Sequence, residues 1–478
     1  DAYNVAVGYN AGLYVTTGAN NVLIGGLAGD ALTTGFGNTA LGHGALSTED
    51  AGDRSVGVGY FALNAQNVSG GGNAYNVAVG YGAGEVVSTG NENTLIGGLA
   101  GDALTTGAGN VALGFRALSA EDAHGGNTAL GYSALRLQNA GADAYNVAVG
   151  YNAGEAVSTG IRNTIMGGNA GSALTTGDRN VVVGYGALAT EDAHGYNVAI
   201  GQQALATLNA GADGYNVAVG QHAGYAMTTG TLNTLIGGLA GDAITTGTRN
   251  ILIGYTAGSA LVEGGSNVAV GYQALMTEDA HGANTAIGYN ALAVQNAGAD
   301  AYNVAVGYNA GVSVITGVQN TLIGAQAGDA LTTGEKNVAI GYNALSAEDG
   351  NGHNVAIGHS ALATLNAGAD AYNVAVGYKA SELMSTGVQN TIIGGHAGDA
   401  LTTAGGNVAI GYNSLSSATI GNSNVAIGKN AMNANVAADR NVAIGQEALN
   451  AMTSATTLDT YNTAIGYQAG AAVTSGVQ

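Results

Sequence analysis

Residues 127–135 of the chain read NTALGYSAL, and residues 337–345 read NVAIGYNAL. Both begin with Asn, then Val or Thr, Ala, an aliphatic residue and Gly. This pattern recurs along the whole sequence. We call each copy a rung and number its positions from the Asn. There are 27 rungs, and they begin at Asn4, Asn21, Asn38, Ser55, Asn76, Asn93, Asn110 and Asn127 and continue in the same way through Asn441 to Asn462.

The spacing between rungs is 17 residues almost everywhere and 19 or 21 residues at intervals. The longer steps close a larger repeat, usually of four rungs and 70 residues, although the repeats from Asn216 and Asn373 hold five rungs. A repeat this regular indicates one extended repetitive structure and not several globular domains. We therefore interpret residues 1–478 as a single unit whose larger repeats begin near residues 4, 76, 146, 216, 303, 373 and 462.

Several positions of the rung barely vary. Position 1 is Asn in every rung except that of Ser55, position 5 is Gly in all, and position 8 is Ala in all but that of Ser414. Apolar residues alternate over positions 2 to 4, which predicts a short strand. Its second and fourth residues face one side, and Ala and Gly face the other side, where something packs closely. Gly at position 5 then permits a sharp corner.

Seventeen residues are too few for an independent domain, but they suffice for one coil of a parallel β-solenoid. We expect the strands to stack in parallel at ~4.8 Å per rung, which gives a rod on the order of 130 Å long. Stacking places each Asn above the next, so their side chains can hydrogen-bond as a ladder along the axis. The alternative is that Asn is there only for its preference for turns.

There are two kinds of rung, one usual in the first two rungs of a larger repeat and the other in its later rungs. In one kind position 9 is Gly and position 12 is apolar, as in Gly29 with Leu32; in the other position 9 is Leu and position 12 is usually polar, as in Leu46 with Glu49. A core of fixed volume predicts this exchange. Position 6 is often Tyr when position 3 is Ala. It is usually Gly when position 3 is larger, as in the rung that has Leu95 at position 3 and Gly98 at position 6.

Composition excludes several classes of function. The net charge is −21, from 31 acidic and 10 basic residues, so nucleic acid and anionic membranes are disfavoured as partners. The chain has no Cys, hence no disulfides or thiolate metal sites, and no apolar run approaches the length of a membrane span.

The motif in NTALGYSAL and NVAIGYNAL resembles two related groups of proteins, over essentially the whole chain. One is the head of trimeric autotransporter adhesins. The other is a set of phage tail-fibre and fibre-like proteins with tandem NTAVGYQAL repeats. The resemblance implies a left-handed parallel β-roll in which three chains associate around one axis. The 17-residue step and the grouping in four rungs depart from the usual adhesin-head spacing.

One recurring set of polar residues could bind a divalent cation. It consists of a Glu–Asp pair followed by His, at Glu121-Asp122-His124, Glu191-Asp192-His194 and Glu278-Asp279-His281; Glu49-Asp50 and Glu348-Asp349 repeat the pair without that His. A solvated polar turn explains the recurrence more simply. An active site would also occur once and not five times.

Three other recurring features allow binding hypotheses. Stacked Asp residues could bind calcium, Thr pairs are typical of ice-binding solenoids, and exposed Tyr rings could stack on surface sugars or on one another. The residues concerned are Asp30, Asp102, Asp242, Asp329 and Asp399; Thr33-Thr34, Thr105-Thr106 and Thr175-Thr176; and Tyr9, Tyr81, Tyr151 and Tyr308. The sequence assigns no catalytic, cofactor-binding or metal-binding residue, and calcium is the one cofactor left open.

We therefore expect a structural fibre or adhesin shaft and not an enzyme. It would be extracellular, on a virion or cell surface, homotrimeric, and would project a binding end toward a host glycan or receptor. The alternatives are a repetitive binding module for glycan, metal ion or ice, and a subunit of a self-assembling extracellular filament.

The ends of the chain fall at repeat junctions. DAYNVAVGY at Asp1 also opens internal repeats, and the GVQ that ends at Gln478 precedes the Asn of a further rung elsewhere. Solenoids need caps at their open ends. We therefore expect a segment of a longer protein, or a subunit whose ends neighbours cover.

Overall fold

We analysed a computed structural model of the chain. It describes residues 2–68, 70, 72–453, 457 and 459–475. Asp1 and Val477-Gln478, on which the expectation about the two ends partly rests, lie outside these residues. No described residue lies in a helix, so this part of the chain holds no helix that could cross a membrane.

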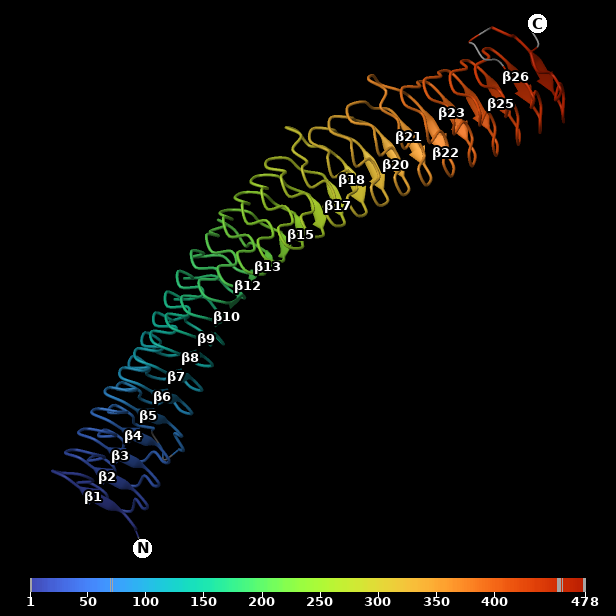
Figure 1. Cartoon of the computed structure of the whole chain (residues 1–478). Coiled ribbons are helices and arrows are strands. Elements are labelled where there is room, and N and C mark those ends of the chain that lie inside the picture. The colour runs from blue at the N-terminus through green and yellow to red at the C-terminus, as the bar shows by residue number, and fades with distance from the viewer. Residues whose placement is uncertain (1, 69, 71, 454–456, 458, 476–478) are drawn as a thin grey trace. The chain divides into compact units, whose positions relative to one another are not determined.

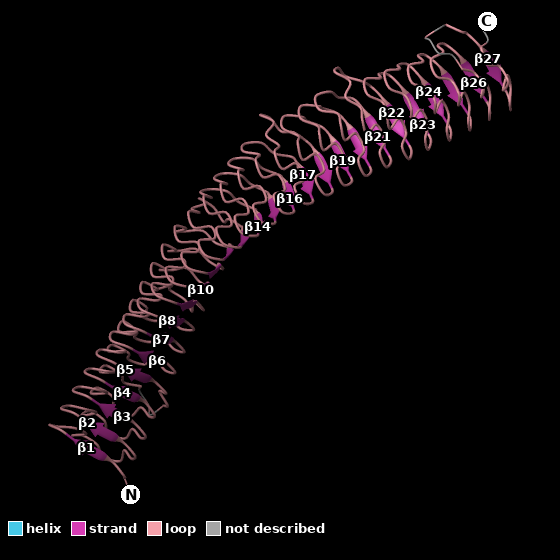
Figure 2. Ribbon diagram, viewed as in Figure 1, coloured by secondary structure: helices cyan, strands magenta, loops and turns pink. Residues whose placement is uncertain are grey.

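The chain contains two units, Asp1–Leu239 and Ala240–Gln478, and each is a stack of rungs. Every rung holds one strand of three residues (Figures 1 and 2). The strands of the first unit are β1 (Val5–Val7), β2 (Val22–Ile24), β3 (Thr39–Leu41), β4 (Val56–Val58), β5 (Val77–Val79), β6 (Thr94–Ile96), β7 (Val111–Leu113), β8 (Thr128–Leu130), β9 (Val147–Val149), β10 (Thr164–Met166), β11 (Val181–Val183), β12 (Val198–Ile200), β13 (Val217–Val219) and β14 (Thr234–Ile236). Those of the second unit are β15 (Ile251–Ile253), β16 (Val268–Val270), β17 (Thr285–Ile287), β18 (Val304–Val306), β19 (Thr321–Ile323), β20 (Val338–Ile340), β21 (Val355–Ile357), β22 (Val374–Val376), β23 (Thr391–Ile393), β24 (Val408–Ile410), β25 (Val425–Ile427), β26 (Val442–Ile444) and β27 (Thr463–Ile465).

Successive strands within each unit pair in parallel and in register. Val147 of β9 lies beside Thr164 of β10, which in turn lies beside Val181 of β11. Each position of the rung therefore forms a column of its own copies. The predicted fold class, an all-β parallel β-solenoid of 27 rungs with a 17-residue repeat, is confirmed. Turns and loops complete each rung around its strand (Figure 2).

The Asn column forms the predicted ladder. The backbone N–H of Asn163 donates to Oδ1 of Asn146 at 2.8 Å, and Oδ1 of Asn163 accepts the N–H of Asn180 at 2.9 Å. The Asn163 side-chain amide also donates across its own rung to the carbonyl of Gly177 at 2.8 Å. All three Asn residues are buried. These three Asn residues thus join adjacent rungs and close their own turns, which turn preference alone would not require. The bond that closes the turn is not made in every rung, since the side-chain amides of Asn127 and Asn284 have no hydrogen-bond partner among the described residues.

The core of each rung is formed by positions 3, 8, 9 and 12, which are buried almost throughout. The exchange predicted between positions 9 and 12 is not what the core shows, because position 12 is buried both as Leu32 and as Glu49. Position 9 exchanges its volume with position 3 instead. Where position 3 is Leu23, a Cβ on Gly29 at position 9 would lie 2.8 Å from Leu23 Cδ2. Where position 3 is Ala40, position 9 is the buried Leu46. The small residues of the strand thus face the core of their own chain, and positions 2 and 4 face outward.

Gly at position 5 lies where only Gly fits. Gly167 has φ +133°, and an added Cβ would lie 2.6 Å from the carbonyl oxygen of Gly184 in the next rung. Gly168, the adjacent residue, does not have a positive φ of this kind. A Cβ added to Gly168 would have Tyr185 Cδ2 as its nearest atom, at 3.5 Å, which is an ordinary van der Waals contact. The close stacking of backbones therefore requires Gly at position 5 but not at position 6.

These neighbours provide a matched pair of substitutions. We predict that Gly167→Ala destabilises the chain by roughly 3 kcal/mol or more, because its methyl group collides with backbone. Gly168→Ala should change stability by less than about 0.5 kcal/mol. Thermal unfolding followed by circular dichroism measures both. Equal effects of the two substitutions would contradict the assigned role of position 5.

Candidate functional site

Two sets of side chains recur in places where they could carry function. The first, which we call the acidic turns, contains the five Glu–Asp pairs predicted from the sequence. The second, the aromatic column, contains the rings at position 6. The acidic turns lie at positions 12 to 15, after the core residue at position 9.

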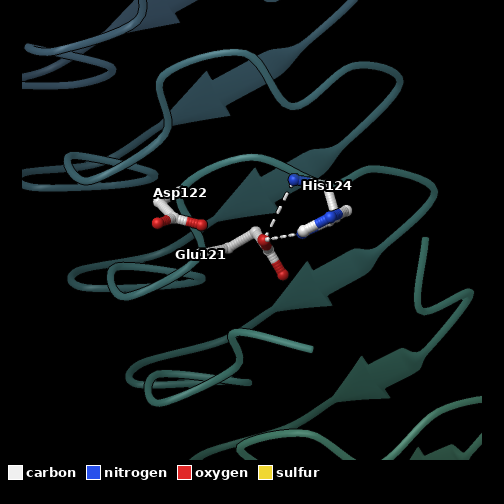
Figure 3. Close-up of side chains that lie close together, drawn as sticks. All are labelled: Glu121, Asp122 and His124. Carbon is white, nitrogen blue, oxygen red and sulfur yellow. Dashed lines mark hydrogen bonds and ion pairs between the residues drawn. The ribbon is translucent and has the colours of Figure 1, made fainter. Parts of the chain in front are cut away.

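Glu121, Asp122 and His124 show the geometry of an acidic turn (Figure 3). Oε1 of Glu121 accepts the backbone N–H of His124 at 3.1 Å, and His124 Nδ1 lies 3.6 Å from the same oxygen. Glu121 is completely buried, Asp122 is exposed and His124 is half-buried. One potential ligand atom from each lies within 4.8 Å of the others.

The other two turns with His repeat this arrangement. His194 Nδ1 lies 3.2 Å from Glu191 Oε1, and His281 Nδ1 lies 3.7 Å from Glu278 Oε1. Only these three turns, among the residues that the structure describes, bring three potential metal ligands of the His, Asp or Glu type together. A carboxylate pair with imidazole suits a divalent transition metal. However, Glu Oε1 already has a donor from its own turn, which a purely structural turn would also show.

The interpretation of the acidic turns as solvated holds for Asp122 but is wrong for the Glu residues. Glu49, Glu121, Glu191, Glu278 and Glu348 are all completely buried. They are buried because they occupy position 12, whose side chains stack in the core. Position 12 is the core position that Leu32 fills in the preceding rung, and neither kind of rung turns this side chain outward. The sequence could have predicted this burial, because Leu occupies position 12 in other rungs.

The buried carboxylates differ in how well they are satisfied. Oε2 of Glu49 accepts the side-chain amide of Gln66, which lies in the same column of the next rung, at 2.8 Å. Oε2 of Glu191 accepts the N–H of Ala210 at 3.1 Å. Oε2 of Glu121 and of Glu278 has no hydrogen-bond partner among the described residues. Burial raises the pKa of Glu121 and of Glu278 above the ordinary value for Glu.

The remaining polar candidates take part in the stack itself. The Asp residues proposed for calcium lie at position 10 and are half-buried; burial raises the pKa of Asp102 and of Asp329. Asp399 is paired with His396 Nδ1 at 3.2 Å. The Thr33 hydroxyl donates to the carbonyl of Asp50 in the next rung at 2.9 Å. The corresponding bond of Thr105, to Asp122, is 2.6 Å, so these hydroxyls link rungs.

The aromatic column consists of half-exposed rings stacked along the axis. Ring centroids are 5.5 Å apart for Phe115 and Tyr132, 5.2 Å for Tyr132 and Tyr151, and 5.1 Å for Tyr272 and Tyr289. Their planes are within 24° of parallel. Such pairs contribute about 0.5–1.5 kcal/mol beyond the area they bury. The rings thus support packing between rungs, and they also form the main aromatic surface of the chain.

No family model of known proteins matches the chain, and a search among curated proteins found no similar sequence. The resemblance to adhesin heads and tail fibres therefore stays a prediction from the repeat motif.

The buried Glu278 gives a prediction about pH. Its pKa is raised in the folded chain, so the folded state binds this proton more readily than the unfolded state. The stability that this group contributes is full below the ordinary pKa of Glu and is lost as the pH rises through the raised value. We predict that Glu278→Gln increases stability at pH 7, on the order of 1 kcal/mol, and has less effect near pH 4. Thermal unfolding at both pH values tests this.

Glu49→Gln is the control. Oε1 of Glu49 accepts the N–H of Gly52 and Oε2 accepts the amide of Gln66, whereas Gln has one acceptor oxygen for these two donors, so the substitution should destabilise the chain at pH 7. A loss of stability in Glu278→Gln as large as that in Glu49→Gln would contradict the prediction.

Proposed function

We propose that the chain is the shaft of an extracellular fibre or adhesin, such as a phage tail fibre or a fibre-like surface appendage. The observation that carries the proposal is the repetition of one set of bonds between rungs. Strand register and the Asn ladder recur with the same partners in both units. A structure of this kind is stiff along its axis, and no one rung is set apart from the others by the bonds that join it to its neighbours.

The proposed role is mechanical. Each rung contacts its neighbours through backbone pairing, and most rungs add the Asn ladder or stacked rings, so bending requires many interactions to lengthen together. Such a shaft would hold a binding end away from a particle or cell, toward a host glycan or receptor. We propose no catalytic role, because the polar turns recur from repeat to repeat, whereas an active site is asymmetric and occurs once.

We further propose that the chain is a homotrimer that associates through its outward strand face, defined as positions 2 and 4 of the rungs. Position 2 is Val, Thr or Ile in every rung, and position 4 is Val, Ile, Leu or Met, so the face carries no charge in a chain of net charge −21. Leu113 and Met166 are each 43% exposed on it. Between the two columns the face covers on the order of 450 Å² over β1 to β14.

An uncharged stripe of this size in one unit is within the range of about 300–600 Å² for the largest patch on a monomer, and such patches are often functional, so it supports association. The small residues at position 3, which the sequence suggested for the interface between chains, already pack within their own rung. The outward face is therefore the surface that we assign to the partner chains.

Association through this face can be tested by introducing two charged residues on it. We predict that the wild-type chain has three times the mass of one chain by analytical ultracentrifugation, and that Leu113→Lys with Met166→Lys yields monomers. The far-ultraviolet circular dichroism should not change, because neither side chain enters the core. As a control, Leu13→Lys with Leu137→Lys, exposed outside this face, should remain trimeric. A monomeric wild type would refute the proposed association.

A further inference from the structure

The aromatic column is interrupted wherever position 6 lacks a ring. Gly or Ala takes this position at Gly26, Gly98, Gly168, Gly238, Ala325 and Gly395. At Gly168 the rung before carries Tyr151 and the rung after carries Tyr185. Two steps of ~4.8 Å leave about 10 Å between these two rings. We call this space, with Asn169 at its edge, the Gly168 slot.

The faces of the two rings that border the slot are open to solvent. Tyr151 is 57% exposed and Tyr185 is 60% exposed. Tyr132, Tyr272 and Tyr289, which have a ring on both sides, are 47%, 42% and 45% exposed. The difference corresponds to a ring face that no neighbour covers.

The equivalent space at Gly395 shows what fits. There the His396 ring of the chain itself lies 5.2 Å from the centroid of Tyr378 and 6.2 Å from that of Tyr412, and its plane is steeply inclined to both, at 74° and 87°. The gap therefore admits one small ring. In the rung after Gly98 the guanidinium of Arg116 lies over the Phe115 ring, 5.3 Å from its centroid.

The Gly168 slot has neither of these fillers. Asn169 stands at the position of His396, and the residue after Tyr185 is Gly186, which has no side chain. No ring contact or cation–π contact of the described residues involves Tyr185, and the one ring contact of Tyr151 is with Tyr132. The chain thus places two tyrosines two rungs apart, with no ring of the described residues stacked between them.

We propose that the Gly168 slot binds a neutral hexopyranose of β-gluco configuration, sandwiched between Tyr151 and Tyr185. A ring midway would lie about 5 Å from each tyrosine, within the range of ring stacking. A ligand held between two aromatic faces needs two apolar faces. The all-equatorial pyranose has them, because its axial C–H bonds point to both sides and its hydroxyls lie on the rim.

Two features determine which sugars are accepted. Asn169 directly follows Gly168 in the chain, and in the proposed complex its side-chain amide hydrogen-bonds a hydroxyl on the rim. The axial 4-hydroxyl of a galactoside would point at one tyrosine and lose a hydrogen bond to water there. The net charge of −21 disfavours acidic sugars. This inference does not depend on the proposed shaft function, since a shaft without sugar sites would remain a shaft.

The experiment uses the full chain labelled with 3-fluorotyrosine, with the resonances of Tyr151 and Tyr185 assigned by substitution. Methyl β-D-glucopyranoside should shift both resonances with a dissociation constant on the order of 1–10 mM. Methyl β-D-galactopyranoside, which differs only at C4, should bind at least about five-fold more weakly. No shift of either resonance by the glucoside, or equal affinity for the two glycosides, would overturn the proposal.

Substitutions tie binding to the slot. Gly168→Tyr restores the residue that other rungs carry at position 6 and should abolish the response. Tyr185→Gln, which copies Gln202 of the next rung, should weaken binding about ten-fold and is a second route if Gly168→Tyr folds poorly. Tyr14→Ala, which removes a ring that is 61% exposed and lies outside the aromatic column, should change nothing.

Two results would reject the sandwich. One is undiminished binding of the glucoside by folded Gly168→Tyr and by Tyr185→Gln. The other is a slot that responds to phenol but not to the glucoside, which would make it a site for aromatic groups.

Discussion

The hydrogen bond from the backbone N–H of one Asn to the side-chain oxygen of the Asn in the preceding rung is the interaction on which the rest of the structure depends. It fixes the register of adjacent rungs, because shifting a rung by one residue would leave buried amides and carbonyls without partners. In most rungs the same side chain also donates to position 15, as Asn163 does to Gly177 at 2.8 Å. One residue type therefore sets both the stacking and the closure of the turn.

Register in turn explains why the surface is so uniform. Once every position forms a column, an outward-facing column is apolar, aromatic or polar along much of its length. Function can then arise from the whole column, or from a rung in which a different residue type interrupts it. Positions 2 and 4 give the uncharged face that we assign to association, and position 6 gives the aromatic column. The Gly168 slot is an interruption, and it has a distinct chemistry only because Tyr151 and Tyr185 are held one rung away on each side.

Much of the fold could be predicted from the sequence, because invariant residues in register leave few other arrangements. Asn at position 1 and Gly at position 5 predicted the ladder and the tight corner. The burial of Glu121 could not be recognised from residue type, since a backbone N–H three residues on, at His124, offsets only part of the cost of desolvation. Left-handed turns at non-glycine residues, such as Leu188 at φ +46°, were also beyond prediction, because stacked neighbours hold the backbone there.

The most direct test of this account is hydrogen exchange at Asn180 in the variant Asn163→Ala. The substitution removes the acceptor of the Asn180 N–H and the donor to Gly177, and both groups are buried. Leaving them unsatisfied costs about 2–5 kcal/mol, so exchange of the Asn180 amide should accelerate roughly 30-fold or more. The exposed Asn209→Ala should leave that rate unchanged. Unaltered protection of Asn180 in Asn163→Ala would show that strand pairing alone holds the rungs together, contrary to the role assigned to the ladder.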